Sequence, residues 1–510
     1  MKLIGAAMAV FGQIKSKLFG RWTRPVNFYL FVSLICLGTL LLYQQPLWSD
    51  AVLVSDLPSG LGIVQLASLQ VLQFCLLATL LFWISTVSIV AMKVVSIVFA
   101  LTNAAALYFM WSYQMVIDAT MVANILNTDA AEASGLWDAG IVPYVLVLGV
   151  IPSLLIWKVT ISKPRWFWRL GAGVVSLVCL IAFLFATSFT WLWYDQNATR
   201  LGSKILPWSY VINTARYYNQ LALNDREQVL LPAATFLEAA PTSKEIVVLV
   251  IGESARAENF SLYGHDQDTN AFTAKTSLVA LPAGLSCATN TISSTACILT
   301  HEGREASSHT SFEPLPSYMT RSGIETFYRT NNSGPPPVKT THFERAKDIA
   351  AACDGADCPD GALDESLNWH LGKALAASTS DRIFVTLHQK GSHGPAYVDR
   401  YPADFGAFAP VCDSVQVSKC TEQSLINAYD NSILYTDFLL ADLITQLDAI
   451  PNANVAMLYV SDHGQSLGEG GYYLHGAPVS IAPKEQLDVP FLVWMSDGFM
   501  QTRGLRYADI

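Results

Sequence analysis

The chain has 510 residues, more than one ordinary domain requires. Apolar residues make up 52% of it and charged residues only 14%, against about a quarter in typical soluble chains. The formal net charge of -10 disfavours nucleic acid as a partner, because phosphate backbones select basic surfaces. The long apolar runs gather in residues 26–193, and the later residues have the composition of a globular domain. The sequence therefore predicts a membrane part followed by a soluble part.

Five apolar runs approach the roughly 20 residues that a membrane-spanning helix needs. They lie at about 26–43, 66–91, 94–112, 141–157 and 170–190, with Lys93 taken as the break between the second and the third. A cleaved signal peptide is the rival reading of residues 1–45, but its apolar core would be too long and no small-residue cleavage site follows. We therefore expect a transmembrane domain of five helices over residues 1–194.

Basic residues are confined to alternate ends of these predicted spans. The opposite loops carry Asp and Glu but no Lys or Arg, so the positive-inside rule predicts a cytoplasmic amino terminus and places everything after Thr190 outside. The basic residues that set this orientation are Lys15, Lys17, Arg21, Arg24, Lys93, Lys158, Lys163, Arg165 and Arg169.

Six of the nine cysteines fall in the polar half, in three close pairs. Such spacing outside the membrane part predicts disulfides and an oxidising compartment. A zinc site made of thiolates is disfavoured, because no Cys-x-x-Cys occurs. The expected pairs are Cys287 with Cys297, Cys353 with Cys358, and Cys412 with Cys420.

The residues after the spans divide into a bridge and a soluble domain. Residues 195–243 form a polar linker that includes an amphipathic, aromatic-rich helix suited to a membrane surface. Residues 244–510 alternate strands with helices, which predicts an α/β fold with a sheet buried on both faces. The expected strands are Ile246–Ile251, Ile383–Leu387, Val455–Val460 and Val489–Trp494.

Potential metal ligands follow three of the four expected strands, where α/β folds gather their ligands. A lone Asp-His pair is commonly a helix start and a lone His-Gly-Pro a turn, but their convergence favours a zinc-type site. Gly464 is expected to permit the turn that aims the preceding pair inward. The candidates are Glu253, His388, His393, Asp462, His463 and His475.

A cluster of hydroxyls lies between Cys287 and Cys297. A hydroxyl bound to a metal loses its proton readily and becomes a nucleophile. Composition alone leaves five candidates open, namely Thr289, Thr291, Ser293, Ser294 and Thr295.

These stretches resemble the membrane-bound phosphoethanolamine transferases, especially the lipid A-modifying group that includes transferable polymyxin-resistance enzymes. The resemblance covers nearly the whole chain, including the five spans. It rests on long motifs: Gly252-Glu253-Ser254-Ala255-Arg256, Cys287-x-Thr289-x-Thr291, Asn331-Asn332-Ser333, His388-Gln389-x-Gly391-Ser392-His393-Gly394-Pro395, Tyr429-Asp430-Asn431-Ser432 and Ser461-Asp462-His463-Gly464.

The resemblance implies a soluble domain of the alkaline phosphatase and sulfatase type with Thr291 as nucleophile. It implies one tightly bound Zn²⁺, held by Glu253, Thr291, Asp462 and His463. His393 and His475 would bind the phosphoryl group or a second zinc, and His388 would support a ligand without touching the metal. Substrate-binding positions carried over are Asn332 and Ser333, with Asn124, Thr128 and Glu132 near the donor headgroup; from the residues alone, those last three read as a solvated helix face.

The implied reaction moves phosphoethanolamine from phosphatidylethanolamine to a phosphate of lipid A through a phospho-threonine. The expected enzyme is a monomer of the bacterial inner membrane with a periplasmic catalytic domain, and its product would weaken the binding of cationic peptides. Core heptose or periplasmic glucan as acceptor, a phosphoglycerol transferase or sulfatase-like hydrolase, and a binding protein with an inactive site are the alternatives.

The chain departs from the family pattern in three places. Ala288, Asn290 and Ala296 replace residues usual in the hydroxyl loop. Gly334-Pro335-Pro336-Pro337 stands where the family commonly has a substrate-contacting Lys, and the first Lys after it, Lys339, is not assigned that role. The sequence also ends at Ile510, before the family's last helix, so a shortened catalytic domain is expected.

Overall fold

The computed structural model falls into two compact units. The first unit comprises Met1–Phe109 and Ala139–Ser209, and the second comprises Met110–Asp138 and Tyr210–Ile510. The residues that the structure describes are 25–55, 57–112, 116–117, 121–122, 125–126, 139–224, 228–236, 243–306, 312–332, 337–355, 357–414 and 417–507.

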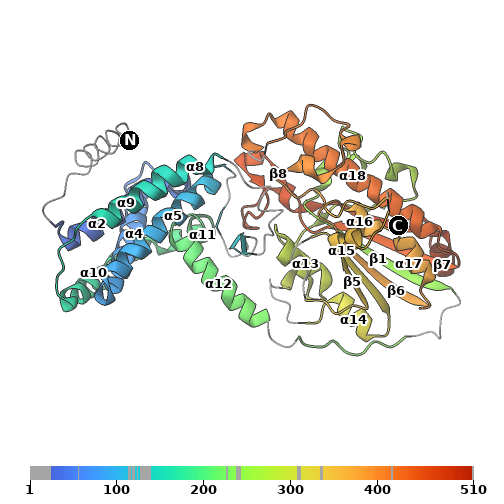
Figure 1. The fold of residues 1–510 in the computed structure, drawn as a ribbon, viewed down its shortest axis with the longest axis horizontal. Coiled ribbons are helices and arrows are strands. Elements are labelled where there is room, and N and C mark those ends of the chain that lie inside the picture. Colours follow the sequence, from blue (N-terminus) through green and yellow to red (C-terminus); the bar gives the residue numbers. More distant parts are fainter. Residues whose placement is uncertain are drawn as a thin grey trace, which may run out of the picture. The chain divides into compact units, whose positions relative to one another are not determined.

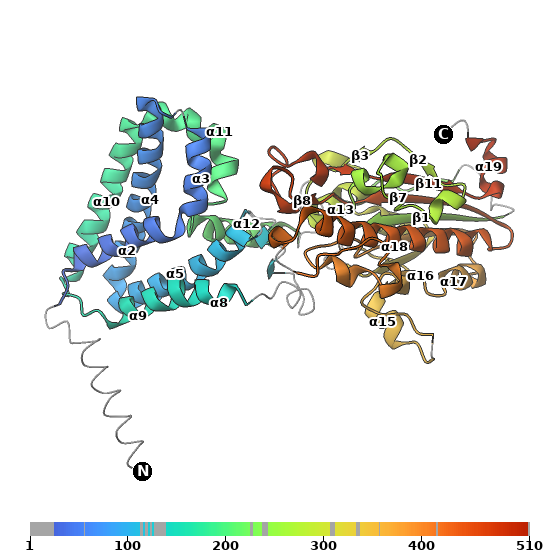
Figure 2. The same ribbon diagram turned by 90° about the horizontal axis from the view of Figure 1, so that it is seen from above.

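Long apolar helices build the first unit (Figures 1 and 2). Over the described residues, four helical stretches are long and apolar enough to cross a membrane, and a fifth span is present if α2 and α3, bent by 70°, are counted as one. The elements are α2 (Phe28–Tyr43), α3 (Gln45–Val54), α4 (Gly60–Val87), α5 (Ile89–Ser112), α8 (Ile141–Tyr144), the π-helix η1 (Val145–Val150), α9 (Ile151–Lys158), α10 (Trp166–Ala186) and α11 (Trp191–Gly202). α12 (Trp208–Asn224) follows.

The break between α4 and α5 falls at Ser88, five positions before Lys93, which the sequence suggested as the break. Ser88 is extended, with φ -157°, and its hydroxyl accepts the N–H of Ala91 at 3.2 Å. Lys93 is tolerated inside α5 because its Nζ donates to the carbonyls of Trp157, at 3.1 Å, and Val159, at 2.6 Å. The chain therefore turns at Ser88, which caps α5, and the Lys93 ammonium group is bound by backbone carbonyls.

α4 and α10 pack closely through small residues. A Cβ at Gly173 would lie 2.2 Å from Cδ1 of Trp83, so only glycine fits there. Thr79 donates to the hydroxyl of Ser176 at 2.8 Å across the same interface. Small side chains at a helix contact let two backbones approach, as is usual in membranes.

A seven-stranded sheet forms the centre of the second unit, with the order β2-β11-β7-β1-β6-β4-β5. The central strands are parallel, whereas β11 runs antiparallel to β7 and to β2. The strands are β1 (Lys244–Gly252), β2 (Val279–Ala280), β4 (Glu325–Thr330), β5 (His342–Arg345), β6 (Arg382–His388), β7 (Ala453–Ser461) and β11 (Phe491–Met495). Two small ribbons pair β3 (Gly284–Leu285) with β10 (Asp488–Val489), and β8 (Ser466–Leu467) with β9 (Tyr473–Leu474).

Both faces of the sheet are covered, as the apolar run of β1 predicted. Ile246, Val248 and Val250 pack in a cluster with Leu440 of α18, while Leu249 and Ile251 pack with residues of α13 and α14. The helices of this unit are α13 (Thr291–Leu299), α14 (Leu315–Arg321), α15 (Ala346–Ala351), α16 (Glu365–Asn368), α17 (Leu371–Ala377), α18 (Glu422–Asp448) and α19 (Asp497–Arg503). The predicted α/β class is confirmed.

The three predicted disulfides are also confirmed. The Cα atoms are 6.4 Å apart in Cys287–Cys297, 5.7 Å in Cys353–Cys358 and 5.8 Å in Cys412–Cys420. Their partners are separated by 10, 5 and 8 residues, so each bridge closes a local loop.

Candidate active site

The site begins where β1 and β7 end side by side. The two strands pair in register up to Gly252 and Ser461, so the next residues, Glu253 and Asp462, emerge at the same edge of the sheet. Both are fully or almost fully buried. The backbone N–H of Ser254 donates to Oδ1 of Asp462 at 3.1 Å, which ties the two strand ends together.

His463 faces both carboxylates with one ring nitrogen. Its Nδ1 lies 2.8 Å from the carbonyl oxygen of Gly464, which can only accept, so Nδ1 carries the proton. Its Nε2 faces Oε1 of Glu253 and Oδ2 of Asp462, each 3.4 Å away. Neither Nε2 nor that Oδ2 has a hydrogen-bond partner among the described residues.

Such an arrangement fits a metal cation. Burial, and then the adjacent Glu253 carboxylate, raise the pKa of Asp462 well above its usual value. Single ligand atoms of Glu253, His463 and His475 lie within 4.8 Å of one another. Carboxylate oxygen and imidazole nitrogen are ligands that Zn²⁺ accepts, and a positive charge between them would offset their burial.

Thr291 brings a hydroxyl to the same acid. It is the first residue of α13, whose N-cap Asn290 accepts the N–H of Ser293 at 3.0 Å. The Thr291 hydroxyl donates to Oε2 of Glu253 at 2.9 Å. Of the five hydroxyls left open by the sequence, all within described residues, Thr291 is the one that contacts Glu253; Thr289 donates instead to the carbonyl of Ala477, at 2.6 Å.

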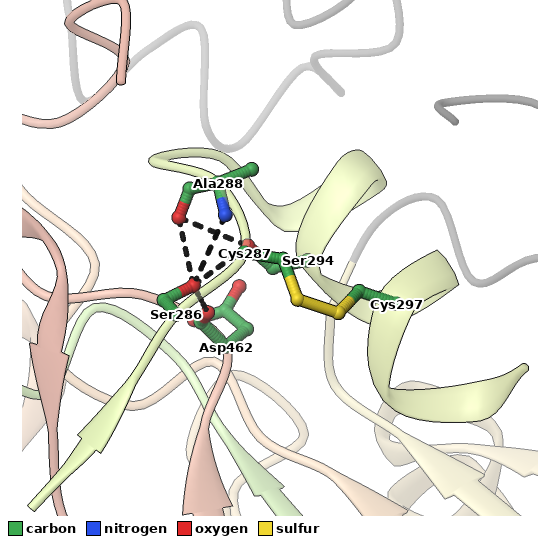
Figure 3. Close-up of a disulfide and its surroundings, with 6 residues drawn as sticks. All are labelled: Ser286, Cys287, Ala288, Ser294, Cys297 and Asp462. Carbon is green, nitrogen blue, oxygen red and sulfur yellow. Dashed lines mark hydrogen bonds between the residues drawn. A yellow bond between two sulfur atoms is a disulfide. The ribbon is translucent and has the colours of Figure 1, made fainter. Parts of the chain in front are cut away.

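Ser286 joins this hydroxyl loop to the end of β7 (Figure 3). Its hydroxyl lies within hydrogen-bond distance of the Asp462 carbonyl, of the Ala288 carbonyl, at 2.7 Å, and of the Ser294 hydroxyl, at 3.1 Å. Ser294 also donates to the Ala288 carbonyl at 3.2 Å. The loop that precedes Thr291 is therefore fixed to the backbone of a candidate ligand.

Two further histidines lie beside this group. The His475 ring centre is 4.5 Å from that of His463 and 5.1 Å from that of His393. His475 Nδ1 lies 2.8 Å from Oε1 of Gln465 and 3.4 Å from the Ser254 hydroxyl. Burial lowers the pKa of His393 to about 4 and that of His475 well below its usual value, so both rings are neutral at neutral pH.

Several residues contact the candidate ligands in ways that the sequence did not predict. Asn332, expected to bind substrate, donates its amide to Oε2 of Glu253 at 2.7 Å and to the Gln389 carbonyl at 3.0 Å. Ser254, with φ 56°, donates to Oε1 of Glu253 at 2.6 Å. Gln465 fixes His475. The remaining expected substrate residues, Asn124, Thr128, Glu132 and Ser333, lie outside the described residues.

Gly464, which was expected to permit the turn after Asp462 and His463, is needed there for space and not for a left-handed backbone. Its φ is not among the positive values of the described glycines, but a Cβ there would lie 2.1 Å from the carbonyl oxygen of Glu485. Gly391, by contrast, has φ 48°, and a Cβ there would lie 2.6 Å from the carbonyl oxygen of Glu253. Gly391 therefore lets its loop approach the backbone of Glu253, and Gly464 lets the segment after His463 approach the backbone of Glu485.

Side chains of the long helix α18 form hydrogen bonds with the segment that follows β1. Tyr429 donates to the Ser254 carbonyl at 2.7 Å and accepts the N–H of Arg256 at 2.9 Å. Asp430 accepts the amide of Asn259 at 2.5 Å. Asp437 accepts from Asn270, Phe272 and Thr273.

His388 predicts a pH dependence of stability. It is fully buried at the end of β6, neither ring nitrogen has a partner among the described residues, and burial lowers its pKa to about 4 from 6.5. Below pH 6.5 the unfolded chain binds the proton and the folded chain does not, so stability is full above that pH and falls toward pH 4, by about 3 kcal/mol. Thermal unfolding of the full-length protein should show a shallower acid decline for His388→Leu.

The control for that measurement is His301→Leu, because His301 is exposed. It should retain the acid decline of the unaltered protein. Equal pH slopes for His388→Leu and His301→Leu would contradict the assignment to His388.

Comparison with known proteins gives the family. A family model described as "Phosphoethanolamine transferase EptA/EptB" matches residues 74–222, and one described as "Sulfatase" matches residues 245–508. A solved structure of the integral membrane phosphoethanolamine transferase EptA from Neisseria meningitidis superposes with a TM-score of 0.84 at 27% identity, covering 95% of this chain and 92% of that chain.

Relatives of known activity agree. Phosphoethanolamine transferase EptA of Helicobacter pylori is 34% identical over 86% of this chain and 83% of its own length. Phosphatidylethanolamine transferase Mcr-1 of Escherichia coli is 34% identical over 79% of this chain and 78% of its own length. Together with the apolar helices and the sulfatase-like α/β domain, these matches show that the chain belongs to the EptA/EptB family of membrane phosphoethanolamine transferases.

Proposed function

We propose that this transferase moves phosphoethanolamine from phosphatidylethanolamine to a phosphate of lipid A through a covalent phospho-threonine at Thr291. The observation that carries the proposal is the 2.9 Å contact between the Thr291 hydroxyl and Glu253, beside the unpartnered atoms of Asp462 and His463. This contact brings the hydroxyl of the proposed nucleophile to a group of oxygen and nitrogen atoms that could bind a cation.

Glu253, Thr291, Asp462 and His463 would hold one Zn²⁺, with His475 close enough to join or to take a second ion. A bound Zn²⁺ would supply Lewis acidity that lowers the pKa of the threonine hydroxyl and offsets charge on the phosphoryl oxygens. Asn332 and Ser254 keep Glu253 in place through their hydrogen bonds to its two oxygens.

Transfer takes two displacements at phosphorus. Oγ1 of Thr291 attacks the donor, the bond to the diacylglycerol oxygen breaks, and phosphoethanolamine remains on Thr291 at the start of α13. The start of a helix favours phosphate oxygens, because its N–H groups and dipole point at them. A phosphate oxygen of the acceptor then attacks the same phosphorus and releases Thr291.

His393 and His475, whose rings lie next to each other and, for His475, next to His463, would bind the phosphoryl group and act on the second substrate. Their lowered pKa keeps both rings neutral, so each can accept a proton during one displacement and return it in the other. Gln465 orients His475 for this task.

Donor, acceptor and location rest on relatives and on charge. Mcr-1 is named for phosphatidylethanolamine, and a 26% identical relative from Escherichia coli is named Kdo(2)-lipid A phosphoethanolamine 7''-transferase. The three disulfides and the basic loops support an inner-membrane protein with the amino terminus in the cytoplasm and the second unit in the periplasm. The expectation of a monomer rests on the family resemblance alone. Asn124, Thr128 and Glu132 remain proposed contacts of the donor headgroup, and Ser333 remains a proposed substrate contact.

Replacing Thr291 tests the nucleophile and the acceptor together. In bacteria that lack their own transferase, Thr291→Ala should abolish the added phosphoethanolamine on lipid A, because no hydroxyl remains to be phosphorylated, whereas Thr291→Ser should retain part of it. Mass spectrometry of lipid A is the measurement, with Ser293→Ala as the control. Undiminished modification by Thr291→Ala would exclude the covalent step, and addition to core heptose or glucan alone would exclude lipid A as acceptor.

Metal removal tests the cation. Purified full-length protein should contain about one zinc per chain, and Asp462→Asn should lower that content because it removes one charged ligand. Metal analysis of the unaltered protein and of each variant, before and after dialysis against a chelator, is the measurement. Asp364→Asn is the control, because that buried acid accepts the N–H groups of Lys390 and Gly391 instead. Equal zinc content in all three proteins would contradict the ligand assignment.

Ser286→Ala tests the fixation of the nucleophile loop. Loss of its hydroxyl frees the loop from the Asp462 carbonyl and should lower kcat about ten-fold, as expected for roughly 1–2 kcal/mol of lost hydrogen bonding. Donor KM should change little. Ser293→Ala, in the same helix, should keep the original kcat; equal effects of the two substitutions would refute a specific role for Ser286.

A further inference from the structure

A basic pocket lies within the first unit, and none of its lining residues has been assigned to metal, substrate or catalysis. Its volume is about 540 Å³, and its walls come from the α4–α5 junction, the end of α9 with the loop after it, and the first turn of α10. Lys93, Lys158, Lys163 and Arg169 all line it, and none of the described residues that line it is acidic. Four like charges around one space favour an anion as occupant.

Two of the four basic side chains form hydrogen bonds with carbonyls near the ends of helices. Lys93 donates to the carbonyls of Trp157 and Val159 at the end of α9, and Arg169 donates through Nη1 to the carbonyl of Ser85 near the end of α4. Cations at helix ends satisfy the last carbonyls. Capping therefore explains why two of the four residues lie here, but it uses only some of their donors.

Other donors are left over for a ligand. Nε of Arg169 is buried and has no hydrogen-bond partner among the described residues. Lys163 is exposed and takes part in no ion pair within the part of the chain that the structure describes. The pocket also includes Ile89 and Val90, the first residues of the 24-residue helix α5, and the start of a helix adds a preference for anions.

Apolar side chains adjoin these cations. Val87, Val90 and Trp157 line the pocket and are 88%, 59% and 57% exposed. A ligand that satisfies both kinds of surface has a phosphate and an acyl chain. We propose that the pocket binds the phosphate of an anionic phospholipid, as basic pockets between membrane helices do. Phosphatidylethanolamine, the proposed donor, fits it poorly, because its ammonium group would meet cations and none of the described acids.

The test compares lipid retention by the full-length protein in native mass spectrometry, after adding phosphatidylglycerol or phosphatidylethanolamine. We expect preferential retention of phosphatidylglycerol, and Lys163→Glu should weaken it about ten-fold or more, because reversal removes one attraction and adds one repulsion. Lys163→Arg should retain it. If Lys163→Glu disturbs folding, Lys163→Gln serves in its place, because it removes the charge and should weaken phosphatidylglycerol retention by a smaller factor.

Arg165→Glu is the matched control, because Arg165 is exposed in the same loop, carries the same charge and does not line the pocket. Equal losses in Arg165→Glu and Lys163→Glu would show a general surface effect and overturn the proposal, as would undiminished retention by Lys163→Glu. Thermal stabilisation by inorganic phosphate equal to that by phosphatidylglycerol would identify a free-anion site and overturn the lipid assignment.

Discussion

Register between parallel strands is the constraint on which the site depends. β1 lies between β6 and β7 and pairs with β7 residue for residue up to Gly252 and Ser461. Glu253 and Asp462 consequently leave the sheet together and are buried side by side. Two neighbouring buried carboxylates are costly unless a positive charge offsets them. A slip of one residue would turn either acid to the opposite face and leave His463 without its two carboxylate neighbours.

Around this pair the protein places neutral hydrogen-bond donors instead of further charges. Asn332, Ser254 and Thr291 each donate to Glu253, and backbone N–H groups occupy Oδ1 of Asp462. Such donors fix the direction of each oxygen without competing for the remaining lone pairs. α18 supports this arrangement, because Tyr429 forms hydrogen bonds with the backbone just after Glu253. The geometry of the acids is thus determined by residues that carry no net charge.

Features that leave a pattern in the sequence, such as an apolar run or a polar residue just after a strand, were predictable. Contacts between single residues far apart in the sequence were not. The apolar run of β1 predicted a doubly covered strand, and Glu253, Asp462 and His463 were expected to converge because parallel strands end at one edge. Short strands such as β5 carry no such run. The contact of Ser286 with Asp462 spans 176 positions, and a lone serine gives no sign of it. Gly464 shows the same limit, because its need for space arises only once Glu485 packs against it.

The three disulfides link residues only 10, 5 and 8 positions apart. A short loop removes less chain entropy from the unfolded state than a long one, so these bridges contribute less to global stability than bridges between distant segments would. None of them crosses the sheet. Reduction would therefore loosen individual loops while the strands stay paired, and one of these loops, closed by Cys287 and Cys297, carries Thr291. A reducing environment would therefore disturb the position of the proposed nucleophile before it unfolded the domain.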